Sequence, residues 1–295
     1  LMADDFLSEG KLVVYTKGRT PESHSRYEAT SSVADFEKGA LVVMIDQGSA
    51  SASEIVTGAV QDWDRGLVVG TRSFGKGIVQ TQKKLGDGSA VRLAISKYYI
   101  PSGRCIQKPY DKSSKEYNRE VYERYESGEL YDESKIKLPD SLKFKTKAGR
   151  EVYGGGGVVP DVFVPRDTTG ASEYLTNLYI NNVFRQFAVR YSEKNNLKKQ
   201  YADGKAFSEQ FQVTHAILKE FKTFGAEKSV PVVEKDFKTS QKIIELQIKA
   251  FIGRTVYNND GFYPTLHKVD NTFQKAYSLI PAAKELEATG KFSKK

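Results

Sequence analysis

The sequence turns at Gly48-Ser49-Ala50-Ser51-Ala52-Ser53-Glu54, between an apolar run at residues 40–45 and a segment whose apolar residues recur at helical spacing. The run predicts a strand, and the periodic segment predicts a helix from Ala52 to about Trp63. A second apolar run follows at residues 67–69. A strand, a helix and a strand in succession predict an α/β layer, with the small-residue turn where the first strand passes into the helix.

Outward from this turn, the chain separates into two kinds of pattern. Residues 10–106 are mainly strand-like, whereas residues 108–150 place tyrosines among charges and predict a solvated helical insertion. Four glycines at 154–157 precede a return to strand, and further on the apolar residues recur every 3.6 positions. We therefore expect an α/β domain over residues 1–170, containing the insertion, and a mostly helical domain over residues 171–295.

The composition is that of an ordinary globular protein and excludes several classes. Of 295 residues, 45 are Lys or Arg and 37 are Asp or Glu, which gives a net charge of +8. The basic residues are spread among acidic ones without a dense Lys/Arg block, so nucleic-acid binding is not expected. The longest apolar run is far shorter than the roughly 20 residues of a membrane helix, so no transmembrane segment is expected.

Metal, cofactor and disulfide chemistry have little support in the sequence. The three histidines, His24, His215 and His267, are scattered and have no partner at ligand spacing, so no metal site is expected. The single cysteine, Cys105, has no partner for an internal disulfide, which leaves the redox compartment open. No cofactor is expected.

The segment Gly70-Thr71-Arg72-Ser73-Phe74-Gly75-Lys76 fits the spacing of a phosphate-binding loop, but the residues after it do not continue the motif. The next residue is Gly77 instead of the Ser or Thr that holds magnesium, and residues 78–82 alternate like a strand instead of opening a helix. The same segment has the Ser-x-x-Lys spacing of penicillin-binding enzymes, which needs a helical turn that the glycines disfavour. Ser73 is therefore not expected to be a nucleophile, and nucleotide binding remains only as an alternative.

The serine turn suits nucleophilic chemistry for two physical reasons. Its small side chains let a substrate backbone approach, and the helix N-terminus offers unpaired N–H groups and a positive dipole end that stabilise an oxyanion. The alternative is that Ser51 and Glu54 form a capping box and do nothing more, as the Ser-x-x-Glu spacing allows. The turn alone leaves both interpretations open.

A nucleophilic serine needs a base, and no histidine is nearby in the sequence. A lysine can act as the base when burial lowers its pKa, because desolvation disfavours the ammonium form. Lys76, between two glycines at the start of a strand, is the candidate, with an ordinary solvated lysine as the alternative. Residues 76, 78 and 80 share one face of that strand, so Gln80 can orient the lysine amine by a hydrogen bond.

These segments resemble the C-terminal processing, or tail-specific, proteases of peptidase family S41. The similarity covers residues 10–108, resumes at residues 155–161, and rests on four linked motifs in the family's order. The motifs span residues 48–56, 70–80, 87–90 and 98–104. The resemblance implies a partial ClpP/crotonase-like protease core, an α/β fold, in front of the helical domain.

The resemblance also implies a role for each candidate residue. In that family the serine opening Ser-Ala-Ser-Glu is the nucleophile, here Ser51, and the lysine of Phe-Gly-Lys-Gly is the general base, here Lys76. The glutamine four residues later, here Gln80, completes the triad in many bacterial members. The backbone N–H of Ala52 is implied as an oxyanion donor, and Glu54 stays outside the triad. The implied protein is an exported serine endopeptidase of the bacterial periplasm or cell envelope, acting without a cofactor on polypeptides with apolar C-termini.

Two features that family members have before the part matching Leu12 are not in this sequence. One is a PDZ domain, and the other is a glycine-rich segment that supplies the second oxyanion donor. We therefore expect this chain to be part of a longer protein, which also accounts for the missing signal peptide. The alternative function is a catalytically incompetent, protease-like scaffold that binds peptides or a partner protein.

Overall fold

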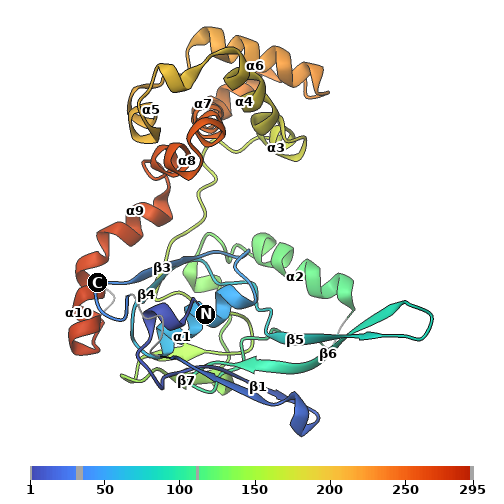
Figure 1. Ribbon diagram of the computed structural model, residues 1–295, viewed down its shortest axis with the longest axis vertical. Helices are drawn as coiled ribbons and strands as arrows, with labels where there is room; N and C mark the ends of the chain where they lie inside the picture. Colours follow the sequence, from blue (N-terminus) through green and yellow to red (C-terminus); the bar gives the residue numbers. More distant parts are fainter. Residues whose placement is uncertain (1, 31–35, 111–112, 293–295) are drawn as a thin grey trace. The chain divides into compact units, whose positions relative to one another are not determined.

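The computed structural model describes residues 2–30, 36–110 and 113–292. The chain divides into two compact units, one comprising Leu1–Arg166 with Asn271–Lys295 and the other Asp167–Asp270 (Figure 1). The first unit combines strands and helices, and the second is helical. The predicted α/β class followed by a helical part is therefore confirmed. No helix in the described ranges is long and apolar enough to cross a membrane.

The small-residue turn connects a parallel sheet to the helix that crosses over it. Strands β3 (Val42–Ile45), β4 (Leu67–Gly70) and β9 (Val162–Phe163) form this sheet in that order. Helix α1 (Ala52–Asp62) lies between β3 and β4 in the chain, as a parallel pair requires a crossover connection. The helix begins at Ala52 as predicted, where Ser51 and Glu54 form a capping box.

A second sheet is antiparallel, with strand order β2-β1-β6-β5. Its strands are β1 (Leu12–Gly18), β2 (Ser25–Glu28), β5 (Ile78–Lys84) and β6 (Ala90–Tyr99). Helix α1 packs against it, since Val13 and Val14 of β1 share a buried cluster with Ala59. The Trp63 indole N–H at the end of the helix donates to the Leu12 carbonyl oxygen at 2.8 Å. The two sheets thus meet through α1, the helix that begins at the serine turn.

The insertion predicted at about 108–150 is helical only in part. It contains helix α2 (Ser114–Glu126) and strand β7 (Lys143–Lys145), which pairs in a two-stranded hairpin with β8 (Glu151–Tyr153) just beyond the predicted end. The hairpin was not predicted, because three-residue strands are too short to show an alternating pattern. Short 3-10 helices η1 to η5 lie at Asp4–Phe6, Pro21–Ser23, Glu133–Lys135, Asp140–Leu142 and Leu197–Lys199.

The second unit is a bundle of six helices packed around aromatic rings. They are α3 (Glu173–Ile180), α4 (Val183–Lys194), α5 (Gly204–Gln210), α6 (His215–Glu227), α7 (Glu234–Tyr257) and α8 (Asn259–Leu266). The periodicity predicts one helix through residues 175–191, whereas the structure breaks it at Asn181 and Asn182. Asn182 has φ 54°, in the left-handed region that asparagine tolerates better than most residues.

The last two helices group with the first unit by their contacts. Helices α9 (Asn271–Ser278) and α10 (Ile280–Thr289) bury Ala276, Ala283 and Leu286 against β4 and its neighbours. From the sequence we expect all residues after 170 to form one helical domain. By their contacts, residues 271–295 instead group with the first unit. Helical periodicity shows which face of a helix is buried but not which core buries it.

Candidate active site

Ser51 occupies a sharp turn between β3 and α1. Its backbone has φ 59° and ψ −115°, a conformation that a residue with a Cβ rarely adopts. Strain of this kind persists only where the surrounding structure fixes it, and a strand-to-helix turn with such a serine is how hydrolases present a nucleophile. Ser51 is half-buried. The local geometry is therefore that of a presented serine as well as that of a helix cap.

Glu54 ties this turn to the segment that carries Lys76. Its side chain is buried, with 1% of its surface exposed, and its carboxylate accepts four hydrogen bonds. Oε2 accepts from the backbone N–H of Ser51 at 2.9 Å and of Lys76 at 2.8 Å. Oε1 accepts from the Ser73 hydroxyl at 2.5 Å and the Gly75 N–H at 2.7 Å. Both backbone N–H groups donate to the same oxygen, Glu54 Oε2. The distance between the Ser51 and Lys76 nitrogens therefore cannot exceed the sum of these two hydrogen-bond lengths.

We call residues 73–77 the Lys76 loop, and a second contact links it to the serine turn. The Phe74 N–H donates to the Ser49 carbonyl oxygen at 2.9 Å. Gly75, at φ +86°, lets the other side of the loop pack closely, because a Cβ there would lie 3.1 Å from the Lys108 Cβ and from the Gly157 nitrogen. The serine turn and the Lys76 loop are therefore held together by contacts to their backbones.

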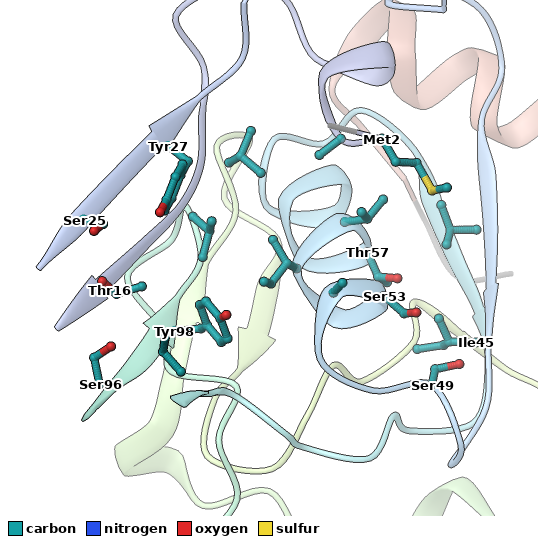
Figure 2. A pocket seen from close by; sticks show the side chains of 18 of the residues that line it. Met2, Thr16, Ser25, Tyr27, Ile45, Ser49, Ser53, Thr57, Ser96 and Tyr98 are labelled. Carbon is teal, nitrogen blue, oxygen red and sulfur yellow. The ribbon is translucent and has the colours of Figure 1, made fainter. Parts of the chain in front are cut away.

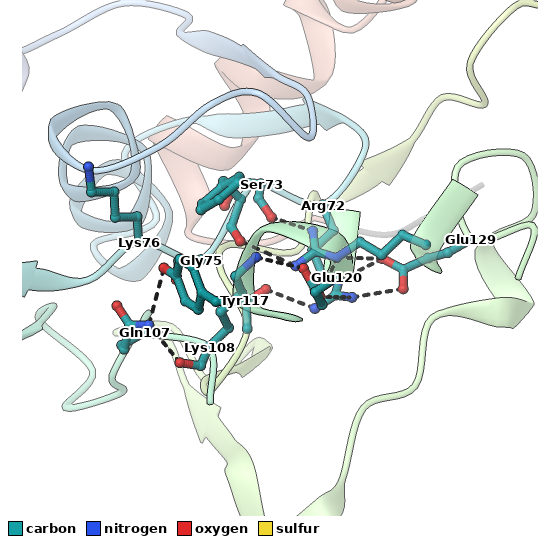
Figure 3. Close-up of polar contacts among 12 residues, drawn as sticks. Arg72, Ser73, Gly75, Lys76, Gln107, Lys108, Tyr117, Glu120 and Glu129 are labelled. Atoms are coloured by element: carbon teal, nitrogen blue, oxygen red, sulfur yellow. Dashed lines mark hydrogen bonds and ion pairs between the residues drawn. The ribbon is translucent and has the colours of Figure 1, made fainter. Parts of the chain in front are cut away.

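The side chains of the predicted triad are not in contact. Lys76 and Gln80 are both exposed, and Figure 3 shows the Lys76 side chain extending away from the Arg72 and Glu129 pair. Among the described residues, no hydrogen bond joins the side chains of Ser51, Lys76 and Gln80. The burial that the sequence argument requires for a lysine base is not present around Lys76. The triad therefore stays a prediction.

The first residue of α1 presents a donor beside the serine. Ala52 is exposed, and its N–H finds no acceptor within the part of the chain that the structure describes. It belongs to the first turn of the helix, where unpaired N–H groups and the dipole favour negative charge. This is the arrangement that an oxyanion donor needs, although no second donor is identified.

A largely apolar cavity of about 810 Å³ opens next to the serine turn. Figure 2 shows it between Tyr27, Thr16 and Ser96 on one side and Ser49 and Ser53 on the other. Apolar side chains of β1, β3, α1 and β6 line most of the remainder, and Glu22 and Ser23 also border it. A cavity of this size and lining suits apolar side chains of a ligand, and its rim includes Ala52.

The alternatives raised by the Gly70–Lys76 segment lose their structural basis. Ser73 is 1% exposed, and its hydroxyl both donates to Glu54 and accepts from the Val158 N–H at 2.7 Å. It is therefore a structural group. Strand β5, not a helix, follows Gly77, so the loop lacks the helix N-terminus of a phosphate site. Among the described residues, no group of three or more His, Cys, Asp or Glu side chains could hold a metal ion.

Two segments of the chain match the models of known families. Residues 1–112 match the model of peptidase family S41, and residues 174–258 match a family of unknown function, DUF8443. The chain is 40% identical over 167 residues to a carboxy-terminal-processing protease of Bartonella bacilliformis, covering 56% of this chain and 36% of the relative.

A plant relative and a solved structure are also similar to part of this chain. The chain is 41% identical over 97 residues to carboxyl-terminal-processing peptidase 1, chloroplastic, of Arabidopsis thaliana, covering 33% of this chain and 19% of the relative. A photosystem II D1 C-terminal processing protease aligns with a TM-score of 0.36 at 26% identity, covering 57% of this chain and 31% of that protein. The chain thus spans little more than a third, or less, of these relatives.

Proposed function

We propose that the first unit carries the Ser–Lys site of a C-terminal processing endopeptidase, a proposal supported by the match of residues 1–112 to the model of peptidase family S41. One observation carries the proposal. The strained serine turn and the Lys76 loop are joined by a single buried carboxylate, Glu54, although they are 25 positions apart in the sequence. A helix cap alone would not require Glu54 to hold a second, distant loop.

In the proposed reaction the Lys76 amine removes the proton of the Ser51 hydroxyl as the serine oxygen attacks a substrate carbonyl. The Ala52 N–H donates to the oxyanion that develops. Collapse of the tetrahedral intermediate breaks the peptide bond, and the lysine proton passes to the leaving amine. A water then gives a proton to Lys76 and attacks the acyl-enzyme. Collapse of this second tetrahedral intermediate releases the new C-terminus, and the Lys76 ammonium returns its proton to the Ser51 oxygen, which restores both residues. Gln80 orients the lysine amine.

Lys76 is exposed, so its role as a base depends on what covers it during the reaction. Catalytic contacts often tighten only when substrate binds. We propose that an apolar polypeptide end occupies the cavity beside the serine turn and that the bound polypeptide covers the exposed Lys76 amine during the reaction. This assigns polypeptides with apolar C-termini as substrates. From the bacterial and chloroplast relatives, we further propose export to the periplasm or cell envelope of a bacterium.

A second candidate function is favoured by the exposed Lys76 and the missing side-chain contact with Ser51. In that case the first unit is a protease-like scaffold that binds an apolar peptide in the same cavity without cleaving it. Binding without cleavage would distinguish this scaffold from the enzyme.

The test compares wild-type protein with Ser51→Ala, Lys76→Ala and Gln80→Ala on an unstructured polypeptide with an apolar C-terminus. We expect the first two to lose turnover on the order of 10⁴-fold or more, because nucleophile and base act as a unit. Gln80→Ala should lose roughly tenfold, since it only orients the amine. Lys84→Ala, at an exposed lysine of β5, is the control for loss of a charge. Retained turnover in Lys76→Ala would show that another group is the base.

A further inference from the structure

The insertion helix α2 holds the carbonyl groups of the Lys76 loop. Arg124 Nη1 donates to the Ser73 carbonyl oxygen at 2.6 Å, and Nη2 donates to that of Phe74 at 3.3 Å. The Tyr117 hydroxyl donates to the Gly75 carbonyl oxygen at 3.4 Å. Glu54 already binds the donors of the same loop. The loop is therefore bound through its donors by α1 and through its carbonyls by α2.

The groups on α2 are themselves fixed in place. Arg124 is 3% exposed, and its Nε lies 2.6 Å from Glu120 Oε1. Lys108 is 2% exposed, and its ammonium lies 2.9 Å from Glu120 and 3.9 Å from the Phe74 ring centroid. It also lies 4.4 Å from the centroid of the Tyr117 ring. Figure 3 shows Lys108, Tyr117 and Glu120 close to Gly75.

A neighbouring pair extends this support. Arg72 binds Glu129 through two hydrogen bonds of 2.7 Å and donates to the Gly156 carbonyl oxygen at 2.9 Å. A bidentate pair fixes both position and orientation of the guanidinium. Arg72 directly precedes the Lys76 loop, so the loop begins at a clamped residue.

Stability alone does not explain why cations are buried here. Burial lowers the pKa of Arg124 and of Lys108, because both charges lose water. Buried ion pairs often stabilise a fold no better than apolar side chains of similar size would. What Arg124 adds is geometry, since a planar guanidinium can hold two consecutive carbonyl groups at once.

We propose that α2 is a positioning element for the proposed reaction and that Arg124 is a positioning residue. By holding the carbonyls of Ser73 and Phe74, Arg124 fixes the backbone from which Lys76 projects, and so limits where the amine can be placed relative to the serine turn. This inference rests on the proposed role of Lys76 as the base. A misplacement of about 1 Å in a catalytic group can lower turnover roughly 100-fold, so the contact has a measurable consequence.

The test uses Arg124→Ala, Arg124→Lys and Tyr117→Phe, with Arg150→Ala as the matched control. Arg150 is a mostly buried arginine of the same unit that binds Asp64 and Asp161 and does not contact the loop. Two measurements are made on each protein. One is the hydrogen-exchange rate of the Gly75 and Lys76 amides, and the other is kcat and KM on an unstructured polypeptide.

Arg124→Ala should speed exchange of the two amides about tenfold and lower kcat about 10- to 100-fold, with KM within about twofold. Arg124→Lys should show both effects more weakly than Arg124→Ala. A lysine keeps the charge, but it binds only as a point charge and cannot hold two carbonyl groups as the guanidinium does. Tyr117→Phe removes one hydroxyl without removing a charge, and should lower kcat a few-fold. Arg150→Ala should change neither the hydrogen-exchange rates of the Gly75 and Lys76 amides nor the ratio of kcat to KM.

The inference is overturned if the two amides keep their wild-type exchange rates in both Arg124 variants and in Tyr117→Phe. It is also overturned if exchange rises while kcat stays unchanged, or if Arg150→Ala has the same effects. Absence of turnover in the wild type would contradict the proposed function instead. In that event the exchange rates still decide whether α2 positions the loop.

Discussion

The first unit buries carboxylates and cations, whereas the second buries aromatic rings. Among the described residues of Asp167–Asp270, the buried polar side chains are Ser208, Ser240 and Thr265, and none of them carries a charge. The first unit buries charged side chains on several elements. They include Glu54, Asp62, Asp64, Arg65, Arg104, Lys108, Arg124, Glu129 and Asp161.

The core of the second unit is of the kind that maximises stability. The rings of Phe184 and Phe221 are stacked with centroids 5.2 Å apart, and Phe187 meets Phe221 edge to face at 5.1 Å. Aromatic pairs of this geometry add to the free energy of burial without any polar group to satisfy. Such a core tolerates small shifts, because dispersion contacts have no strict direction.

The interior of the first unit has the opposite character. A buried charge is tolerated only when every partner is in place, and removing one partner leaves an uncompensated charge. Arg150 shows the pattern, since it binds Asp64 and Asp161 on different elements. Burial raises the pKa of Asp161, and only the partners around it oppose this effect. The contrast indicates that the first unit is built for fixed positions of polar groups, as a reaction site requires.

Phe221→Ala should give the largest loss of stability, and it tests whether the aromatic core of the second unit is separate from the core of the first. Phe221 is fully buried, and truncating such a phenylalanine costs about 4 kcal/mol of unfolding free energy. Urea unfolding followed by far-UV circular dichroism should shift to lower urea. The fluorescence of Trp63, the single tryptophan and part of the first unit, should not shift. Tyr263→Ala, at an exposed ring of α8, is the control, and equal shifts of both signals would contradict separate cores.

Arg104→Met should cost about 3 kcal/mol in the first unit, because it leaves a buried carboxylate without its cation. Arg104 is fully buried, and its Nη2 lies 2.9 Å from Asp62 Oδ1. Trp63 fluorescence should report the loss. The double variant Arg104→Met/Asp62→Asn should regain about 1 kcal/mol or more, since Asn keeps an acceptor for the Ser102 N–H that Asp62 binds. A double variant as unstable as the single one would show that packing, not charge, is what matters.

The parts of the fold that could be predicted from sequence are those set by short-range patterns. The serine turn, the start of α1 at Ala52 and the strand after Gly77 each follow from residues within one element and its flanks. The Ser-x-x-Glu spacing likewise indicates that Glu54 reaches the Ser51 N–H. These features depend on local backbone geometry, which the sequence encodes directly.

The remainder depends on contacts between distant segments. Nothing near Glu54 in the sequence shows that its carboxylate also binds the N–H groups of Gly75 and Lys76. Arg124 lies 51 positions from Ser73. The sequence pattern around it predicts a solvated helix, on which Arg124 would be an ordinary exposed charge. The sequence left open whether Lys76 is buried or solvated, because burial is decided by tertiary packing. The proposed Ser51–Lys76–Gln80 triad itself remains a prediction.

Glu54→Gln should cost about 2 kcal/mol of unfolding free energy and lower turnover about 100-fold. It therefore tests whether a buried charge of the first unit serves the reaction as well as the fold. The amide replaces one carboxylate oxygen by an NH₂ group, which cannot accept the two hydrogen bonds that the oxygen received. Ser51 and Lys76 then lose their common acceptor, or Ser73 and Gly75 lose theirs. Glu123→Gln, at an exposed carboxylate of α2, is the matched control. Unchanged turnover with reduced stability would make Glu54 a purely structural group.

Lys108→Met should give the smallest effect, visible as a change in pH dependence. Burial lowers the pKa of Lys108 below its usual 10.5 in the folded protein, against the opposing pair with Glu120. Between the lowered value and 10.5, the unfolded chain binds more protons than the folded one, so the contribution of Lys108 to unfolding free energy rises with pH. That contribution is lost as the pH falls through the folded-state pKa.

The measurement is urea unfolding of wild type and Lys108→Met, followed by Trp63 fluorescence at pH 8 and pH 10. The wild type should gain more stability over this interval than the variant, in which Glu120 keeps Arg124 as its partner. Lys143→Met is the control of opposite sign. The hydrogen bond with Glu151 raises the pKa of Lys143, so its contribution is lost only as the pH rises above 10.5. Equal gains in wild type and Lys108→Met would show that the Lys108 ammonium is not desolvated behind the loop, and would remove one of the buried charges on which the contrast between the two units depends.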